Sequence, residues 1–260
     1  MKKGLCILSF LLVILLLVIV IYAINKDSYG KYNDNMISKL SRYYLVDGGI
    51  YEGITTDLKS SETISIDSVS DISLNKTLAS YLLNYESTDK GYSREICKNC
   101  YKGFTDDDTI FFYTKTLVED TSKQAFGKVL KWQEYKENDE RMYNTLYYDK
   151  NFEIYYMAAM RDNDKDDVVM KLKSKDKNKE YLHLYYYFGY ISKNIDETSE
   201  EVKYELKNIK NEVVTKGDDL YVDNDFNYDK YQDKLNIIRY LLKWDKENKI
   251  YKLDKIILEK

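Results

Sequence analysis

An uncharged apolar run near the N-terminus places the strongest constraint on how this chain can fold. It extends over 21 residues, from Gly4 to Ile24, and follows two lysines. At about 1.5 Å of rise per residue, a helix over this run would be roughly 31 Å long, which matches a bilayer core of about 30 Å. Backbone polar groups find no water in lipid, so a spanning segment must be helical. We therefore predict a transmembrane helix over residues 4–24.

A cleaved signal peptide is the alternative interpretation of the same run. Such a peptide has an apolar region of about 7–15 residues before a small-residue cleavage site. The run here is longer, and Ala23 is the one residue that could precede cleavage. A lipoprotein is disfavoured because Cys6 lies at the start of the run and not after it.

The layout of the N-terminus, more than its charge, predicts the direction of insertion. Lys2 and Lys3 precede the run, but Lys26, Lys31 and Lys39 follow it. Counting charges therefore does not decide which end of the helix faces the cytoplasm. A two-lysine stub followed directly by an apolar run is typical of an uncleaved export signal, and long domains translocate largely regardless of charge. We expect a single-pass protein of the cell membrane with its C-terminal domain outside the cytoplasm.

This topology divides the chain into three parts. Residues 1–24 would form a cytoplasmic stub and anchor, residues 25–33 a juxtamembrane linker, and residues 34–260 an extracytoplasmic α+β domain. The polar residues 194–200 mark a subdivision that the sequence leaves open, because the length suits one large domain or two small ones.

The composition argues against a nucleic-acid partner. The net charge is −4, and without Lys2 and Lys3 the chain has 38 basic and 44 acidic residues, a balance of −6. Nucleic-acid binding normally needs a concentrated basic face. The 28 tyrosines and the lack of proline are typical of AT-rich bacterial genomes. The functional alternative is a tyrosine-rich surface that binds glycans or proteins.

The distribution of apolar residues predicts helices first and strands later. Helices are expected over residues 36–46 and 74–85, where apolar side chains recur at helical spacing. From about residue 109, β-branched and aromatic runs alternate with Asp- and Asn-containing turns, which predicts antiparallel strands. The runs are TIFFYTKTLV, QAFGKVLKWQEY, RMYNTLYY, FEIYYMAAM, DVVMKLKS and EYLHLYYYFGYI.

The predicted fold class is α+β, with an N-terminal transmembrane helix followed by a domain dominated by an antiparallel β-meander with a few short helices. The run EYLHLYYYFGYI should be a central strand covered on both faces, because both of its alternating sets are bulky. The C-terminal runs IIRYLLKW and IYKLDKIIL predict a hairpin. Helical spacing from Tyr228 to Leu242 is the competing interpretation.

The C-terminal hairpin carries a family resemblance. A strand that ends in Lys-Trp, a charged turn and then IYKLDKI, within Leu235 to Leu258, resembles the closing hairpin of NTF2-like or cystatin-like α+β domains. Such domains occur on membrane-anchored envelope proteins of Gram-positive bacteria, conjugation-channel components included. Residues 109–191 depart from the family because they contain more strands than one such domain needs. The resemblance carries no catalytic residue onto this chain.

Two cysteines form the most chemically suggestive motif. Cys97 and Cys100 are spaced as CxxC, which serves in disulfides, zinc sites and redox centres. A structural zinc site needs four ligands, and only Cys6 and His183 remain as further Cys or His residues. We predict a structural disulfide, and neither a metal nor another cofactor. His183 should be a packed, hydrogen-bonded strand residue.

Three acidic stretches could be taken for functional loops. Asp162–Asp167 begins like a calcium-binding loop, but Asp167 stands where the turn glycine belongs and Lys173 stands where the bidentate Glu belongs. We interpret it as a solvated turn. Asp106–Asp108 and Asp218–Asp225 are similar, and choosing a catalytic pair among 44 acidic residues has no basis in the sequence.

These observations lead to three functional hypotheses. The first is a non-enzymatic binding or scaffolding domain of an envelope complex with a protein partner. The second is a glycan- or small-ligand-binding module that uses a tyrosine-rich sheet. The third is an anchored enzyme that uses carboxylates or the cysteine pair. A pocket lined by tyrosines and carboxylates would favour the second or third, and a flat apolar patch the first.

Overall fold

A computed structural model describes two short N-terminal segments and most of the chain from residue 61 onward. The described residues are 14–19, 34–44, 61–86, 109–131, 144–159, 167–178, 180–195, 202–223 and 225–260.

The largest element is a seven-stranded antiparallel sheet, the large sheet, in the order β1-β12-β11-β6-β7-β8, with β5 also paired to β6. Its long central strand β6 pairs with β5 along one edge. Along the other edge β6 pairs first with β11 and then with β7, so these two strands lie end to end. The strands are β1 (Thr63–Ser65), β5 (Asp167–Lys177), β6 (Tyr181–Ile195), β7 (Val202–Lys207), β8 (Val213–Lys216), β11 (Asn236–Asp245) and β12 (Ile250–Glu259).

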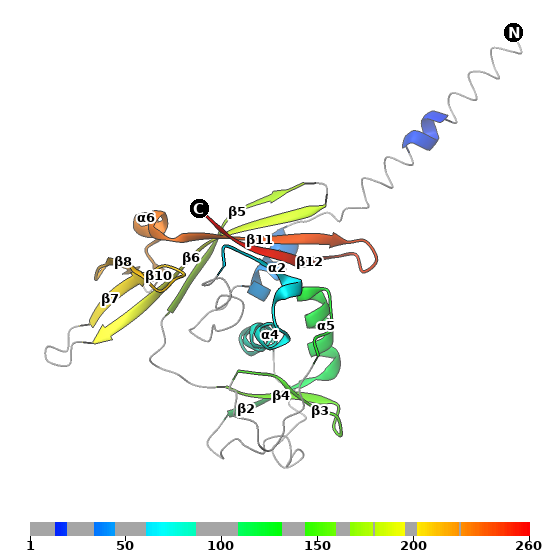
Figure 1. Cartoon of the computed structure of the whole chain (residues 1–260), viewed down its shortest axis with the longest axis horizontal. Helices are drawn as coiled ribbons and strands as arrows, with labels where there is room; N and C mark the ends of the chain where they lie inside the picture. The colour runs from blue at the N-terminus through cyan, green and yellow to red at the C-terminus, as the bar shows by residue number, and fades with distance from the viewer. Residues whose placement is uncertain are drawn as a thin grey trace, which may run out of the picture.

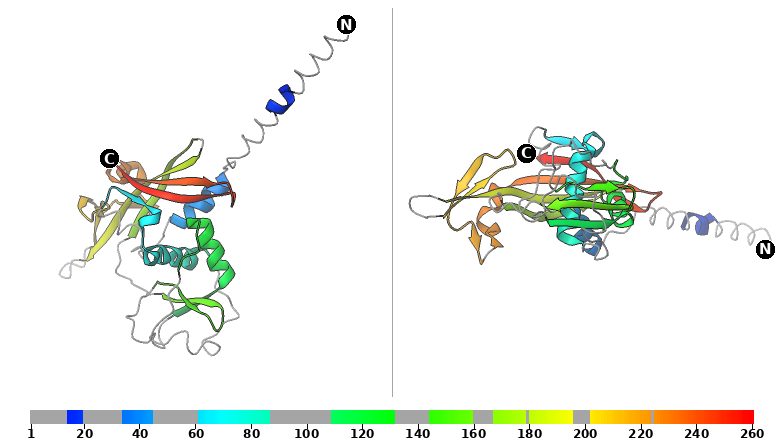
Figure 2. Two further views of the ribbon diagram at one scale, coloured as in Figure 1. Left: turned by 45° about the vertical axis from the view of Figure 1, so that its right-hand side comes forward. Right: turned by 90° about the horizontal axis from the view of Figure 1, so that it is seen from below.

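Helices and a smaller sheet lie on one side of the large sheet. Figure 1 shows α4 and α5 between the large sheet and a three-stranded sheet of order β2-β4-β3, with α2 beside them. A short segment with β9, β10 and α6 lies at the other end of the large sheet (Figures 1 and 2). The elements are α2 (Asp34–Tyr44), η1 (Ile66–Ser68), α4 (Asp71–Tyr85), β2 (Thr109–Thr114), α5 (Lys115–Phe126), β3 (Tyr147–Asp149), β4 (Ile154–Ala159), β9 (Tyr221–Val222), β10 (Asp225–Phe226), α6 (Tyr228–Tyr231) and η2 (Gln232–Lys234).

One hydrophobic core joins these layers. Leu74 and Leu78 of α4, Tyr155 of β4 and Leu184 of β6 are all buried in the same cluster. Polar contacts fix the helix layer in place. The side chain of Asn75 donates to the carbonyl of Leu146 at 2.9 Å and accepts from its N–H at 2.7 Å, both in buried surroundings. Buried backbone groups need such partners, so this pair fixes α4 against the chain that enters β3.

The two faces of β6 differ in burial. Leu182, Leu184, Tyr186 and Phe188 point into the core and are fully buried. The alternate residues, Tyr181 to Tyr187, are half-buried on the opposite face. The prediction of a central strand is therefore confirmed, but the prediction that both faces are covered is wrong for this part of β6. Bulky tyrosines made the second face look like core, whereas a phenol ring tolerates partial exposure.

Gly189 lies where β11 ends and β7 begins along β6. It is buried between Phe188, which pairs with Asn236, and Tyr190, which pairs with Lys207. A Cβ at Gly189 would lie 2.7 Å from Cδ2 of Leu235 and 3.1 Å from the carbonyl oxygen of Lys207. The close approach of three strands at this point therefore requires a residue without a side chain.

We predict that Gly189→Ala lowers the free energy of unfolding by about 1–3 kcal/mol, the usual cost of overpacking a core. Urea denaturation measures this change. Leu235→Ala serves as the matched background, because it removes the nearest clashing atoms. In that background the same glycine substitution should cost clearly less, and equal costs in both backgrounds would contradict the steric explanation.

Asp245 organises the turn between β11 and β12. Its Oδ1 accepts from the backbone N–H groups of Glu247 and Asn248 at 3.0 and 3.1 Å. Its Oδ2 accepts from the side-chain amide of Asn248 at 3.1 Å and lies 3.6 Å from Lys252. Together these contacts hold the pKa of Asp245 below its usual value. The hydrogen bonds from Asn248 contribute most to this lowering.

A carboxyl group with a lowered pKa in the folded state stabilises the protein above its unfolded pKa, near 3.9, and loses this effect as pH falls through the folded value. We predict that Asp245→Ala costs about 1–2 kcal/mol of stability at pH 7. The difference from the wild type should shrink below about pH 4 in urea titrations. Asp233→Ala, at an exposed position of η2, is the control and should change the stability little.

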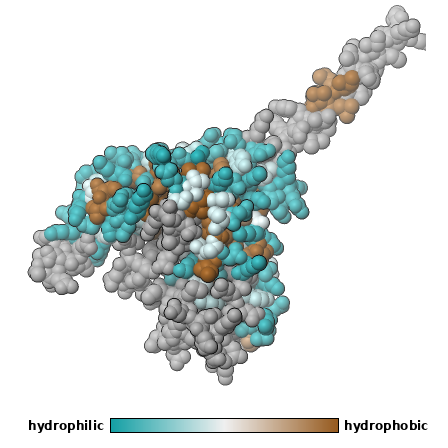
Figure 3. Space-filling view, viewed as in Figure 1, coloured by the Kyte–Doolittle hydropathy of each residue, from teal (hydrophilic) through white to brown (hydrophobic). Residues whose placement is uncertain are grey.

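The predicted fold class is wrong in its first element. Residues 14–19 are helical, and their apolar side chains are 42% to 60% exposed; Figure 3 shows them as a hydrophobic surface. Within the part of the chain that the structure describes, no helix is both long and apolar enough to cross a membrane. The remainder of residues 4–24 lies outside the described residues.

The predicted meander is also wrong in part. Its first two runs form β2 and then helix α5, because Thr114 caps the helix N-terminus and Gly127 ends it in left-handed geometry at φ 71°. The later strands form two separate sheets instead of one sequential array. Antiparallel pairing, the helices near 36–46 and 74–85 and the C-terminal hairpin are confirmed. Helical geometry near Tyr228 is limited to α6 and η2.

Candidate functional site

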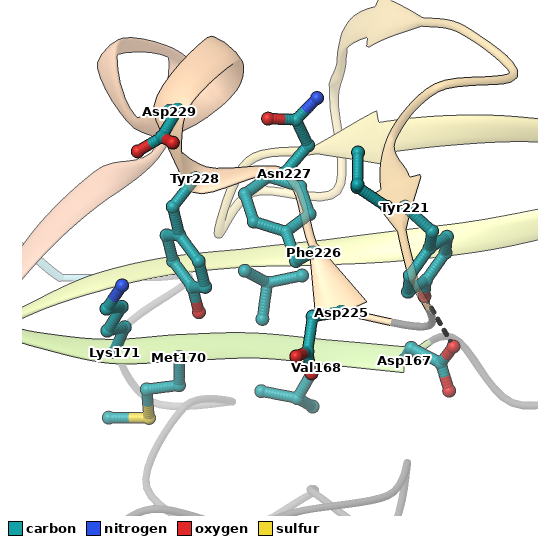
Figure 4. Close-up of a pocket in the computed structure, with 12 residues that line it drawn as sticks. Asp167, Val168, Met170, Lys171, Tyr221, Asp225, Phe226, Asn227, Tyr228 and Asp229 are labelled. Atoms are coloured by element: carbon teal, nitrogen blue, oxygen red, sulfur yellow. Dashed lines mark hydrogen bonds between the residues drawn. The ribbon is translucent and has the colours of Figure 1, made fainter.

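A groove of about 670 Å³ lies between β5 and the segment that carries β9, β10 and the start of α6. This volume falls in the range that holds small ligands or side chains of a partner, about 300–1,000 Å³. Figure 4 shows the two walls facing each other across the opening. The β5 wall contributes residues 167–171, and the opposite wall contributes residues 221–229 apart from 223 and 224.

Aromatic rings form much of the second wall. The ring of Phe226 lies 4.8 Å from the ring of Tyr228 in an edge-to-face arrangement, and Tyr228 lies 6.5 Å from Tyr187 of β6. The ammonium of Lys171 lies 4.5 Å from the centre of the Tyr228 ring. Such a distance is typical of a cation–π contact, so the Tyr228 ring already holds one cation of this chain.

Carboxylates surround the aromatic wall. Asp167 begins β5, Asp225 begins β10 and Asp229 lies in α6. Against the single lysine at position 171, they give the groove lining a formal charge of −2. The hydroxyl of Tyr221 donates to Oδ2 of Asp167 at 2.6 Å and joins the two walls.

The Tyr221 hydroxyl keeps its proton in the groove. Burial is the largest cause that raises its pKa, and the bond to Asp167 raises it further. The phenol therefore remains a hydrogen-bond donor throughout the neutral range. Asp167 keeps its second carboxylate oxygen for other contacts in this geometry.

Asp219 holds the second wall of the groove in place. Its carboxylate accepts from the hydroxyl of Tyr231 at 2.5 Å and from the ammonium of Lys230. The bond from Lys230 is the main cause that lowers the pKa of Asp219, followed by the bond from Tyr231. Asn227 caps α6 by accepting from the N–H of Lys230, and its own N–H donates to the carbonyl of Leu220 at 2.8 Å.

The underside of this wall packs on a second apolar cluster. Its buried members come from β5, β6, β7 and the segment itself, so the wall is part of the folded body and not a free loop. They are Val169, Ile191, Leu206, Leu220, Tyr231 and Leu235.

The residues singled out from the sequence have different outcomes. Cys97 and Cys100 lie outside the described residues, so their disulfide remains a prediction, as do the turn at 162–166 and the loop Asp106–Asp108. Asp167 is a groove residue, while Lys173 is exposed on β5. Among the residues that the structure describes, no group of three Cys, His, Asp or Glu side chains could hold a metal ion.

His183 is a half-buried strand residue, as expected. The side-chain amide of Asn178 donates to its Nε2 at 3.2 Å. Burial, with help from the charge of Arg239, lowers the pKa of His183, so the ring is neutral near pH 7. Its neighbours on the sheet face are Tyr181 and Tyr185, with ring centres about 6.5 and 6.4 Å away.

Sequence reasoning missed the groove because its two walls lie 54 residues apart at the Tyr221–Asp167 contact. The acidic loop Asp218–Asp225 was identified, but nothing in its pattern indicated which strand it faces. The mixture of aromatic and acidic residues from Tyr221 to Asp229 was the available signal. It distinguishes this loop from the purely acidic stretches elsewhere.

Comparison of the chain with models of protein families, with curated proteins and with solved structures finds no match. The resemblance of the C-terminal hairpin to NTF2-like and cystatin-like domains therefore stays a prediction.

Proposed function

We propose that this protein is a non-enzymatic binding protein whose groove between β5 and the β9–β10–α6 segment takes lysine or arginine side chains of a protein partner. The observation that carries the proposal is the combination of three carboxylates with a tyrosine ring that already holds an ammonium group. A groove of this kind was expected to favour a ligand-binding module or an enzyme. The proposal keeps the protein partner of the first hypothesis because the Tyr228 ring already holds an ammonium group. The predicted location outside the cytoplasm stays a prediction of the sequence.

Charge and ring chemistry act together on such a ligand. A cation over an exposed aromatic ring gains about 0.5–1 kcal/mol, and an exposed ion pair gains about 0.2–1 kcal/mol. The carboxylates Asp225 and Asp229 are exposed, so each single contact is weak. Several contacts made at once by a basic segment would give measurable affinity, and salt would weaken it.

A glycan is the second candidate ligand. Phe226 and Tyr228 present ring faces and edges next to carboxylates that can accept from sugar hydroxyls. Such binding would depend on hydrogen bonds and ring contacts, so it would respond little to salt. Salt dependence therefore separates the two ligands.

We predict that Asp225→Asn combined with Asp229→Asn weakens binding of a hexalysine peptide about tenfold. Two exposed ion pairs of up to about 1 kcal/mol each support this size of effect. Isothermal titration calorimetry at 50 and 300 mM salt measures it. Asp233→Asn is the control for loss of a carboxylate elsewhere, since Asp233 is exposed and lies outside the groove.

Three results would count against the proposal. These are wild-type protein that does not bind hexalysine, an equal loss in the Asp233 control, and affinity that does not change with salt. A neutral glycine–serine peptide of the same length should give no heat of binding. Unchanged melting temperatures would show that the variants remain folded.

A further inference from the structure

The large sheet has one face that points away from the helices, here called the outer face. It begins next to the groove and extends to the β1 end of the sheet. Along the upper border of Figure 3, where the large sheet lies in Figure 1, hydrophilic residues dominate. Strand pairing places on it Lys171, Lys173, Ser174 and Asp176 of β5, Tyr181, His183, Tyr185 and Tyr187 of β6, Arg239, Leu241 and Lys243 of β11, and Lys255 and Ile257 of β12.

The outer face is basic although the chain is acidic. It has six cationic side chains, because pairing with Lys243 also places Lys252 on it. Its three carboxylates are Asp176, Glu259, which pairs with Arg239 at 2.6 Å, and Asp245, which lies 3.6 Å from Lys252. Six cations against three carboxylates give +3, in a chain whose net charge is −4. Lys243 and Lys255 are exposed. A concentration of one charge on one face favours ligands of the opposite charge.

Cations of β5 and β11 lie next to the tyrosine rings of β6 on this face. Three cations lie over three tyrosine rings: Arg239 over Tyr185 at 5.7 Å, Lys243 over Tyr181 at 5.9 Å and Lys173 over Tyr187 at 5.3 Å. Tyr181, His183, Tyr185 and Tyr187 occupy every second position of this part of β6, so aromatic rings repeat at about 6.6–6.8 Å along the strand. Each of these three tyrosine rings thus has a positive group close to it.

We propose that the outer face binds an acidic polysaccharide, a sugar chain that carries carboxylates. The rings of Tyr181, Tyr185 and Tyr187 give flat surfaces against which sugar rings pack, and the lysines and arginine beside them pair with the carboxylates. The rings lie along the single strand β6, with cations from β5 and β11 on its two sides, so they can act on one extended sugar chain.

Charge density favours an acidic polysaccharide over a nucleic acid. Duplex DNA carries one negative charge per about 1.7 Å, and proteins that bind it usually have a pI above about 9. This chain has a pI of about 5.3. A face with a net charge of +3 on such a chain suits a polymer with one charge on each sugar, because the charges of that polymer are spaced more widely than those of duplex DNA.

The groove limits the outer face at one end. Lys171 belongs to the outer face and also lies over Tyr228 in the groove, and the carboxylates of Asp225 and Asp229 follow immediately beyond it. Those carboxylates repel an anionic chain, so the sugar chain would run from Tyr187 toward Tyr181 and away from the groove. The two sites therefore take ligands of opposite charge.

Calorimetry with hexagalacturonate as the acidic probe and maltohexaose as the neutral probe tests the proposal. The wild type should bind hexagalacturonate at least tenfold more tightly than maltohexaose. Lys243→Gln combined with Lys255→Gln should weaken hexagalacturonate about tenfold and leave maltohexaose unchanged. The matched control is Lys210→Gln with Lys234→Gln, two exposed lysines off this face that remove the same net charge.

Tyr181→Leu tests the rings separately, because it keeps every cation. It should weaken both probes severalfold, with the melting temperature as the check on folding. The proposal is overturned if hexagalacturonate does not bind, if both lysine pairs reduce its affinity equally, or if oligo-dT of matched charge binds more tightly. None of these variants lies in the groove, so hexalysine binding should stay unchanged, which separates this test from that of the groove.

Discussion

The pairing of β6 on both edges is the constraint on which the rest of the structure depends. Its inner side chains, Leu182 to Phe188, fill the core against the helices. Its edges hold β5 on one side and both β11 and β7 on the other. Gly189 makes the second arrangement possible, because a side chain there would clash with Leu235. The position of every other strand in the large sheet follows from this one.

The same strand separates two surfaces of opposite charge. Toward its C-terminal end, the face away from the helices is covered by the segment with β9, β10 and α6, which forms one wall of the acidic groove. Toward its N-terminal end that face stays half-exposed and carries tyrosines next to lysines and an arginine. Because one end of this face is covered and the other stays half-exposed, a single strand carries two chemically distinct surfaces.

Local patterns in the sequence predicted the local structure well and the long-range arrangement poorly. The aromatic and β-branched residues along Tyr181–Tyr190 and the charged turn at Asp245 indicated strands and a hairpin, because strand composition and turn chemistry are local. Helix α5 was missed because the residues in its interior gave little indication of a helix. Only Thr114 and Gly127 mark its two ends. The groove could not be predicted, because the Tyr221–Asp167 contact and the order of strands around β6 depend on packing between distant segments.

Hydrogen exchange of backbone amides in the free protein tests the central role of β6 most directly. If β6 organises the fold, the amides of residues 182–188 exchange slowest of all, and only when the whole domain unfolds. Amides of β9 and β10, which form a sheet of two short strands, should exchange much faster. Rapid exchange in β6 together with slow exchange in the β2-β4-β3 sheet would contradict the account, because the stable centre would then lie in the smaller sheet.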